Sequence, residues 1–349
     1  MNALRTAACE LFGVRYPIVQ TGMGWVSGPD LTAATANAGG LGILAGATMS
    51  YAELAAAIDR TRELTSQPFG VNLRADAADA RRRADLLISS QVKVASFALA
   101  PRQELVARLK DAGVIVVPSV GARRHAEKVA AWGADAVIVQ GSEGGGHTGP
   151  VATSILLPQV VDAVSIPVIA AGGFFDGRGL AAALCYGAAG IAMGTRFLLT
   201  SDSRVPEAVK RLYLAASVAD TVVTDALDGV PQRLLRTDVT RRLASSGRTA
   251  RLARSARGAA DFRRLTGSTW AALAREGLAM RRAHGLRLGQ VMLAASTPAM
   301  LRAAMVQGRT DYGVMATGQV AGVIDDLPSC AELIERIVAQ AREVLSRLT

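Results

Sequence analysis

Cysteine and histidine are scarce in this chain of 349 residues, and neither occurs in a metal-binding pattern. The three cysteines show no CxxC spacing, and the three histidines form no HExxH or HxxxH pair. We therefore expect no disulfide scaffold, no thiolate zinc site and no other metal centre. No stretch reaches the ~20 uninterrupted apolar residues of a membrane-spanning helix. The N-terminal segment also contains Arg5 and Glu10 where a signal peptide would be apolar, so we expect a cytoplasmic protein without a membrane span.

The composition is that of a folded α/β protein with an uneven charge distribution. Apolar residues make up 50% of the chain and charged residues 19%, which excludes disorder. The length allows one large α/β domain or two ordinary ones. Lys and Arg number 39 against 29 Asp and Glu. Fourteen arginines, no lysine and three acidic residues lie between Arg233 and Arg287, so this arginine-rich segment accounts for the whole basic excess.

Three interpretations of the arginine-rich segment compete. Most charge runs are solvated helical surfaces, and we favour this for any single arginine. A nucleic-acid surface would carry interleaved aromatics, but the segment holds only Phe262 and Trp270 and no zinc-finger or RNP pattern. A rim for a polyanionic small molecule suits arginine, because guanidinium binds phosphate with paired hydrogen bonds. For the cluster we favour this phosphate rim and expect no nucleic-acid partner.

Eight short apolar runs alternate with alanine-rich helical segments between residues 14 and 195. The runs are β-branched and lack strict alternation, which is typical of parallel strands buried on both faces. The runs are Pro17–Gln20, Leu41–Leu44, Phe69–Asn72, Val92–Phe97, Val114–Ser119, Ala136–Gln140, Pro167–Ala170 and Gly190–Met193. Eight strand–helix units at this spacing predict a (β/α)8 TIM barrel rather than a doubly wound sheet.

Polar residues or glycines close most of these runs, at the end of the strands where barrel enzymes carry their chemistry. Asn72 and Ser119 each end an apolar run, although either alone could simply terminate a strand. The loops after the seventh and eighth strands expose backbone N–H groups that suit a phosphate. We place there Gly172, Gly173, Gly194 and Thr195. The alternative is that these glycines only make tight turns.

Four motifs in order carry a family resemblance: PIVQTGMGWVSGPDLTAATANAGGLGIL, QGSEGGGHTG, PVIAAGGFFDGRGLAAAL and GAAGIAMGTRF, with GQVAGVIDDLPSCAELIERIV near the C-terminus. Together they resemble the nitronate monooxygenase superfamily of FMN-dependent TIM-barrel enzymes, which includes FMN-containing enoyl-ACP reductases. EGGGHTGPVATS and MGTRFLLTSDS resemble its mycobacterial and rhodococcal steroid-catabolism branch. Flavoenzymes of that branch act on a coenzyme A thioester of the hydrindane C/D-ring remnant.

The resemblance implies an FMN site at the barrel mouth. The phosphate would be held by the loops after the last two strands, where the matching residues are Ala171, Gly172, Gly173, Gly194 and Thr195. The isoalloxazine ring would lie on Gly22, Met23 and Gly24, with Asn72 and Gln140 among its polar contacts. A flavin needs such an apolar slot with a few fixed donors.

His147 follows three glycines after the sixth strand, on the same rim. Imidazole takes and gives protons near neutral pH, and in the family the histidine at this position is the acid/base residue. Glu143 could orient His147 or cap the loop, and we assign it no catalytic role.

A histidine beside a flavin serves three chemistries: oxidation of a nitronate with O2, dehydrogenation next to a thioester, and reduction of an enoyl thioester. The arginine-rich segment favours a coenzyme A thioester, whose phosphates a basic rim attracts. We predict an FMN-dependent dehydrogenase of a steroid-derived hydrindane acyl-CoA. The alternatives are a nitronate monooxygenase, an enoyl-thioester reductase and a flavin-free isomerase or aldolase barrel. A nucleic-acid-binding module would leave the strand-end residues unexplained.

The predicted domain organisation is one barrel domain with a single inserted subdomain. Residues 1–205 and 306–349 form the FMN domain, and residues 206–305 form a helical, arginine-rich lid after the eighth strand. Candidate contacts with coenzyme A in this lid are Arg263, Arg264, Arg281 and Arg282. The sequence is compatible with a homo-oligomer and does not identify the electron acceptor.

Overall fold

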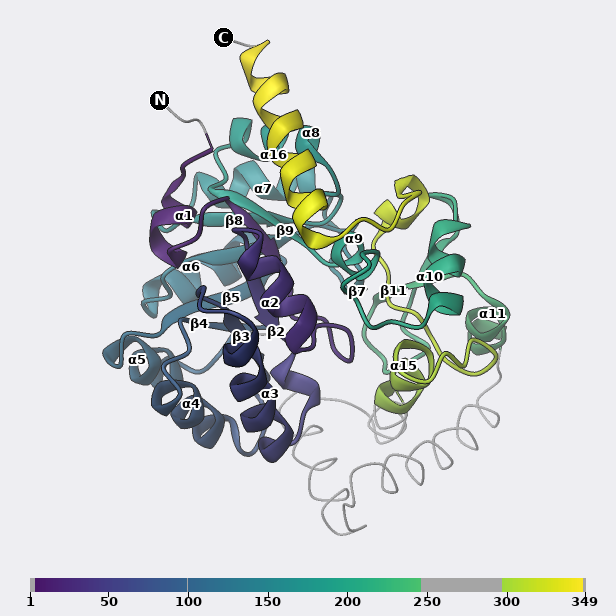
Figure 1. The fold of residues 1–349 in the computed structure, drawn as a ribbon, viewed down its shortest axis with the longest axis horizontal. Coiled ribbons are helices and arrows are strands. Elements are labelled where there is room, and N and C mark those ends of the chain that lie inside the picture. The colour runs from purple at the N-terminus through teal and green to yellow at the C-terminus, as the bar shows by residue number, and fades with distance from the viewer. Residues whose placement is uncertain (1–3, 99, 246–296, 348–349) are drawn as a thin grey trace.

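A computed structural model describes residues 4–98, 100–245 and 297–347 (Figure 1). Eight parallel strands form a closed barrel in the order β1-β2-β3-β4-β5-β6-β8-β9. Their bounds are β1 Ile18–Gln20, β2 Leu41–Leu44, β3 Gly70–Leu73, β4 Val94–Phe97, β5 Ile115–Val120, β6 Val137–Gln140, β8 Val168–Ala171 and β9 Gly190–Met193. The predicted (β/α)8 barrel is confirmed, and each predicted strand overlaps the one observed.

Helices surround the barrel. They are α1 Ala7–Phe12, α2 Pro29–Asn37, α3 Tyr51–Leu64, α4 Ala80–Ser89, α5 Gln103–Asp111, α6 Arg123–Ala131, α7 Thr153–Val161, α8 Gly177–Cys185 and α16 Cys330–Ser346, with short turns η1 Gly46–Thr48, α9 Thr195–Leu198 and η2 Gln319–Val323. Helix α16 packs against α8 and α2, so it completes the ring that β9 leaves open (Figure 1). It begins with a capping box between Ser329 and Glu332, which satisfies the first free N–H groups of the helix.

The barrel interior is filled by one face of each strand, because successive side chains on a strand point to opposite sides. Apolar residues such as Ile43, Val94 and Ile138 form this inner cluster. At the C-terminal ends the same alternation turns four polar side chains inward, and these are Asn72, Ser96, Ser119 and Gln140. The strand register therefore produces a polar ring above an apolar core.

The chain between β9 and α16 forms a smaller unit, which lies beside the barrel (Figure 1). Its described elements are α10 Glu207–Leu214, β10 Thr221–Thr224, β11 Gln232–Leu235, α11 Asp238–Ser245 and α15 Thr297–Met305. They enclose their own apolar cluster, which includes Leu227, Leu234, Met300 and Val314. The predicted contacts Arg263, Arg264, Arg281 and Arg282 lie outside the described residues.

This unit differs from the expected helical insert, because β10 and β11 form an antiparallel hairpin. The hairpin continues onto the barrel, where β11 pairs with β7, the two-residue strand Gly146–His147. The two strands, with the sequences TVVT and QRLL, are too short to be recognised from the sequence. They are stabilised by this pairing and by burial of Leu234 and Leu235.

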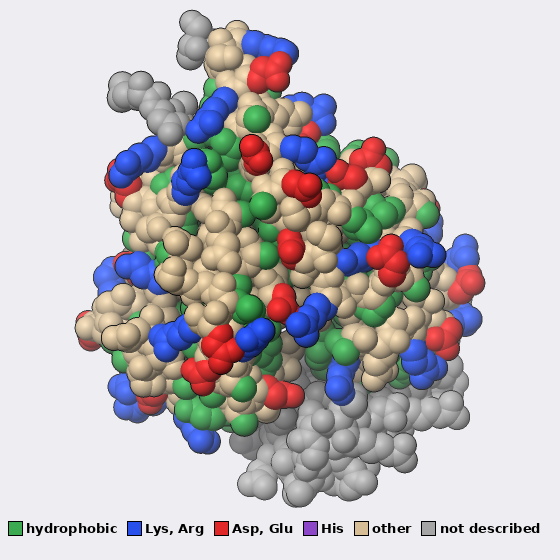
Figure 2. All heavy atoms as spheres, viewed as in Figure 1, with side chains coloured by type: hydrophobic (Ala, Val, Ile, Leu, Met, Phe, Trp, Pro, Cys, Tyr) green, Lys and Arg blue, Asp and Glu red, His purple; other side chains and the backbone are tan. Residues whose placement is uncertain are grey.

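Charged side chains of both signs are interspersed over the face of the molecule shown in Figure 2. The described part of this face therefore carries no broad patch of one sign. Within residues 4–98, 100–245 and 297–347, no helix is long and apolar enough to cross a membrane.

Candidate active site

The polar ring contains two buried side chains that form no hydrogen bond with another described residue. Asn72 and Ser96 are register partners on β3 and β4, and both are buried. No hydrogen bond joins either side chain to another described residue. Buried polar groups are normally paired, so these two offer hydrogen-bonding capacity to whatever fills the mouth.

The Gly22–Gly24 loop lies directly against this ring. A Cβ at Gly22 would come within 2.4 Å of the Asn72 Cβ, and one at Gly24 within 2.7 Å of the Thr48 Cγ2. Only glycine allows this close approach. Ser27 holds the loop, because its Oγ donates to the Thr21 carbonyl at 2.8 Å and accepts from the Met23 N–H at 2.9 Å. The result is a backbone segment held in one position at the mouth, with glycines where it passes Asn72 and Thr48.

The two predicted phosphate loops meet the same mouth. Gly172 and Gly173 adopt left-handed backbone angles, with φ of 93° and 86°, which side chains rarely adopt. A Cβ at Gly194 would come 3.3 Å from the Thr21 Oγ1 and 3.4 Å from the Met23 sulfur. The structure therefore brings Gly194 next to the Gly22–Gly24 loop, although the two are far apart in sequence.

Thr195 is tied to the C-terminal segment. Its Oγ1 accepts a hydrogen bond from the Gly318 N–H at 2.8 Å. The next residue, Gln319, donates its N–H to the Glu143 carbonyl at 2.9 Å. The motif that begins at Gly318 thus joins the loop after β9 to the glycine loop after β6.

The glycine loop after β6 is fixed at several points. The Gln140 Nε2 donates to the His147 carbonyl at 2.9 Å, so this predicted flavin contact also anchors the loop. The Glu143 carboxylate accepts from the Thr153 Oγ1 at 2.8 Å and from the Thr153 N–H at the start of α7. Glu143 therefore caps α7, where the helix dipole favours a negative charge. No hydrogen bond joins Glu143 to His147 within the described part.

Arg233 on β11 holds the beginning of the same loop. Its guanidinium donates to the Ser142 carbonyl at 2.9 Å and to the Thr221 Oγ1 at 2.8 Å. Burial lowers the pKa of Arg233, and the nearby Glu143 carboxylate opposes this effect. Because the cation is partly desolvated and its donors are engaged, Arg233 serves as an anchor of the loop.

His147 contacts a carboxylate that sequence reasoning missed. Its Nε2 lies 2.8 Å from the Oδ2 of Asp228, which is buried in the loop between β10 and β11. The His147 side chain itself is 59% exposed, so a ligand can reach it. The only signal for this loop in the sequence is the Asp228–Gly229 pair, a common turn dipeptide.

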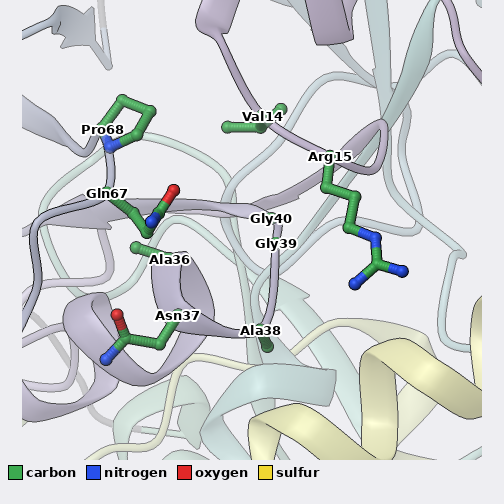
Figure 3. Close-up of a pocket in the computed structure, with 9 residues that line it drawn as sticks. All are labelled: Val14, Arg15, Ala36, Asn37, Ala38, Gly39, Gly40, Gln67 and Pro68. Atoms are coloured by element: carbon green, nitrogen blue, oxygen red, sulfur yellow. The ribbon is translucent and has the colours of Figure 1, made fainter.

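A separate pocket of about 230 Å³ lies at the opposite end of the barrel (Figure 3). Its lining comes from the segments that lead into β1, β2 and β3, including Arg15, Asn37 and Gln67. Barrel enzymes carry their chemistry at the C-terminal ends of the strands. The pocket at the N-terminal ends therefore does not belong to the candidate site.

The barrel, its polar ring and the histidine loop define a (β/α)8-barrel enzyme. A family model described as nitronate monooxygenase matches residues 5–340. This chain belongs to the nitronate monooxygenase family, and it is accordingly an oxidoreductase that uses a flavin.

Two similar proteins carry the name (3aS,4S,5R,7aS)-5-hydroxy-7a-methyl-1-oxo-octahydro-1H-indene-4-carboxyl-CoA dehydrogenase. The one from Mycobacterium tuberculosis is 63% identical over 341 residues, which cover 97% of this chain and 96% of that protein. The one from Rhodococcus jostii is 61% identical and covers 98% of this chain and 97% of that protein. The solved structure of FabK from Thermotoga maritima is 34% identical, with a TM-score of 0.81 over 99% of this chain and 98% of that chain.

Proposed function

We propose that this chain is an FMN-dependent dehydrogenase that acts on the coenzyme A thioester of a steroid-derived hydrindane carboxylic acid. The observation that carries the proposal is the identity of 63% and 61% to two dehydrogenases named for such a thioester. The similarity extends over 97% and 98% of this chain, so it includes the unit between β9 and α16 as well as the barrel.

The mouth fits a flavin nucleotide. The Gly22–Gly24 loop offers backbone and glycine positions to an aromatic ring, and the Asn72 and Ser96 side chains offer hydrogen-bonding groups that no described residue uses. Gly172, Gly173, Gly194 and Thr195 offer backbone N–H groups for one phosphate, which supports FMN as the form of the cofactor. A flavin bound here supplies the two-electron acceptor of a dehydrogenation.

His147 is the base in this proposal. The carbon next to a thioester carbonyl is acidic enough for a positioned imidazole to remove its proton. A flavin held by the glycine loops would accept the hydride of the neighbouring carbon, so that loss of this hydride and of the proton would leave a C=C bond between the two carbons. The proton rests on His147 until solvent takes it. Gln140 fixes the backbone of His147 by donating to its carbonyl.

Anaerobic mixing of the purified, yellow holoenzyme with a hydrindane acyl-CoA tests the proposal. We expect the flavin absorbance to bleach as the substrate is oxidised. His147→Ala should keep the yellow colour and lose the bleaching. His125→Ala, which removes an exposed histidine from α6, should behave as the wild type.

Three results would count against this function. A colourless protein that takes up no FMN would exclude the cofactor. Rapid oxygen consumption with propionate 3-nitronate, without bleaching by the acyl-CoA, would assign a nitronate monooxygenase instead. Full bleaching by His147→Ala would remove the base from the mechanism.

A further inference from the structure

The hairpin formed by β10 and β11 supplies the contact partner of His147. Strand β11 runs antiparallel to β7, with Gln232 opposite His147. The loop that precedes β11 brings Asp228 back to the imidazole, where Oδ2 lies 2.8 Å from Nε2. Asp228 lies outside the barrel strands and 81 positions after His147 in the sequence, and it contacts the proposed base.

Asp228 is held in one position. It is 8% exposed, and its second oxygen, Oδ1, accepts from the Val230 N–H at 3.1 Å. The preceding carbonyl, that of Leu227, accepts from the Thr297 Oγ1 at 3.2 Å, which ties the loop to α15. Both carboxylate oxygens are therefore engaged, and the orientation of the side chain is fixed.

We infer that Asp228 is a positioning residue that sets the tautomer of His147. An ionised carboxylate only accepts hydrogen bonds, so the proton of a neutral imidazole must lie on the contacting nitrogen, Nε2. Nδ1 then keeps its lone pair and can accept a proton from the substrate. When it does, the Asp228 carboxylate stabilises the imidazolium that forms, as the buried aspartate does in serine-protease triads.

The other charged groups near β7 do not compete for this role. Glu143, at the start of the glycine loop, is engaged by Thr153 at the beginning of α7. Arg233, opposite Gly146 on β11, directs its guanidinium to Ser142 and Thr221. Among the described residues, Asp228 is the acidic side chain in contact with the imidazole.

This inference rests on the proposed role of His147 as the base, so its first test does not depend on turnover. Two-bond ¹H–¹⁵N spectra of the holoenzyme report the tautomer of each of the three histidines, and His147→Ala assigns the signal of His147. We expect the Nε2–H form in the wild type. In Asp228→Asn the Nε2–H tautomer of His147 should no longer be the main form, because an amide can also donate a hydrogen bond to Nε2.

The second test is kinetic. Asp228→Asn should lower the rate of flavin reduction about a hundredfold or more, with KM and flavin content unchanged. Asp225→Asn is the matched control, because it removes the same charge from an exposed position in the same loop and should have no effect. Asp228→Glu keeps the carboxylate, so it should keep the Nε2–H form and recover part of the rate.

The outcomes separate the inference from the proposed function. If the wild type shows no reduction by the acyl-CoA but His147 responds to Asp228→Asn, the substrate assignment fails and the contact is upheld. If the tautomer is the same in the wild type and Asp228→Asn, the inference is wrong. It is also wrong if Asp228→Asn and Asp228→Glu lose the same activity and melt at the same lowered temperature, because the loss is then structural. A variant that does not fold is replaced by Asp228→Glu, in which loss of the Nε2–H form contradicts the inference.

Discussion

Gly22 shows how closely the residues at the mouth are packed. Its backbone passes so near Asn72 that a single added carbon would collide with the Asn72 Cβ. Gly28, the N-cap of α2, has no atom within 4 Å of the place that a Cβ would take. Of these two glycines, only Gly22 shapes the site, because only there would a side chain meet another residue.

We predict that Gly22→Ala lowers flavin content severalfold and reduces the melting temperature, because either the loop or Asn72 must move. Overpacking of this kind costs roughly 1–3 kcal/mol. Gly28→Ala should leave flavin content unchanged and lower the melting temperature less than Gly22→Ala does, because Gly28 is the N-cap of α2, where alanine is disfavoured but meets no clash. Absorbance of the purified proteins and thermal melting measure the two effects. Equal flavin content in both variants would show that the loop does not support the cofactor.

At the residue scale, the sequence predicts the direction of a side chain where the signal is local. Asn72 and Gln140 close apolar runs, and the strand register does turn both toward the mouth. Asp228 carried no such signal, because its role depends on antiparallel pairing between a two-residue strand and a hairpin 81 positions away. Periodicity reports the burial of a segment and cannot report which distant loop it meets.

At the scale of elements, the short helix α9 is fixed by an ion pair between a buried arginine and a partly exposed aspartate. Arg196 is 3% exposed, and its Nη1 donates to the Asp326 Oδ1 at 2.8 Å. Arg336 on α16 donates to the other oxygen at 2.6 Å. Burial raises the pKa of Asp326, but its bonds with Arg336 and Arg196 outweigh this effect and leave the pKa below its ordinary value.

This lowered pKa predicts a pH-dependent contribution to stability. A carboxyl whose pKa is lower in the folded than in the unfolded state stabilises the fold above its unfolded pKa, about 3.9, and loses this effect as pH falls through the folded value. Asp326→Asn should therefore melt several degrees below the wild type at pH 7, because it leaves Arg196 buried without its partner. The difference should narrow below about pH 4.

The matched control is Asp111→Asn, which changes an exposed carboxylate at the end of α5 and should melt like the wild type at both pH values. Calorimetry at pH 7 and pH 3.5 makes the comparison. A difference in melting temperature that stays constant between these two pH values would contradict a role for ionised Asp326.

The barrel strands were predictable and the hairpin was not, for one physical reason. Strands such as Val137–Gln140 are buried on both faces and therefore appear as continuous apolar runs. Strand β10 has one exposed face, with Val223 45% exposed, so its sequence is ambiguous. Its conformation is decided by the tertiary pairing with β11.

At the scale of the whole molecule, the formal net charge is +10, and the arginine-rich segment accounts for all of it. Coenzyme A carries a pyrophosphate and a further phosphate. Attraction between the arginines and these phosphates accelerates binding at low salt. At 0.1 M ionic strength this attraction is screened beyond about 10 Å.

We predict that kcat/KM for the acyl-CoA falls about tenfold or more as salt is raised, because screening weakens this attraction. The corresponding pantetheine thioester, which lacks the nucleotide phosphates, should show little dependence on salt. Replacing Arg263 and Arg264, or Arg281 and Arg282, with glutamine should reduce the slope for the acyl-CoA and leave flavin content unchanged. Equal slopes for the two thioesters would exclude an electrostatic role for the segment.

The separation of β9 from α16 also has a consequence for how the polypeptide is made. The helix that completes the ring is translated only after the whole stretch between Met193 and Cys330, so a nascent chain with all eight strands still lacks one side of its shell. Leu333, Ile337 and Val338 cover apolar surface that must stay exposed until then. Exposed apolar surface of this kind promotes aggregation during synthesis. The helical shell around the barrel is therefore completed last, and chaperones that shield apolar surface have the longest time to bind where α16 will pack.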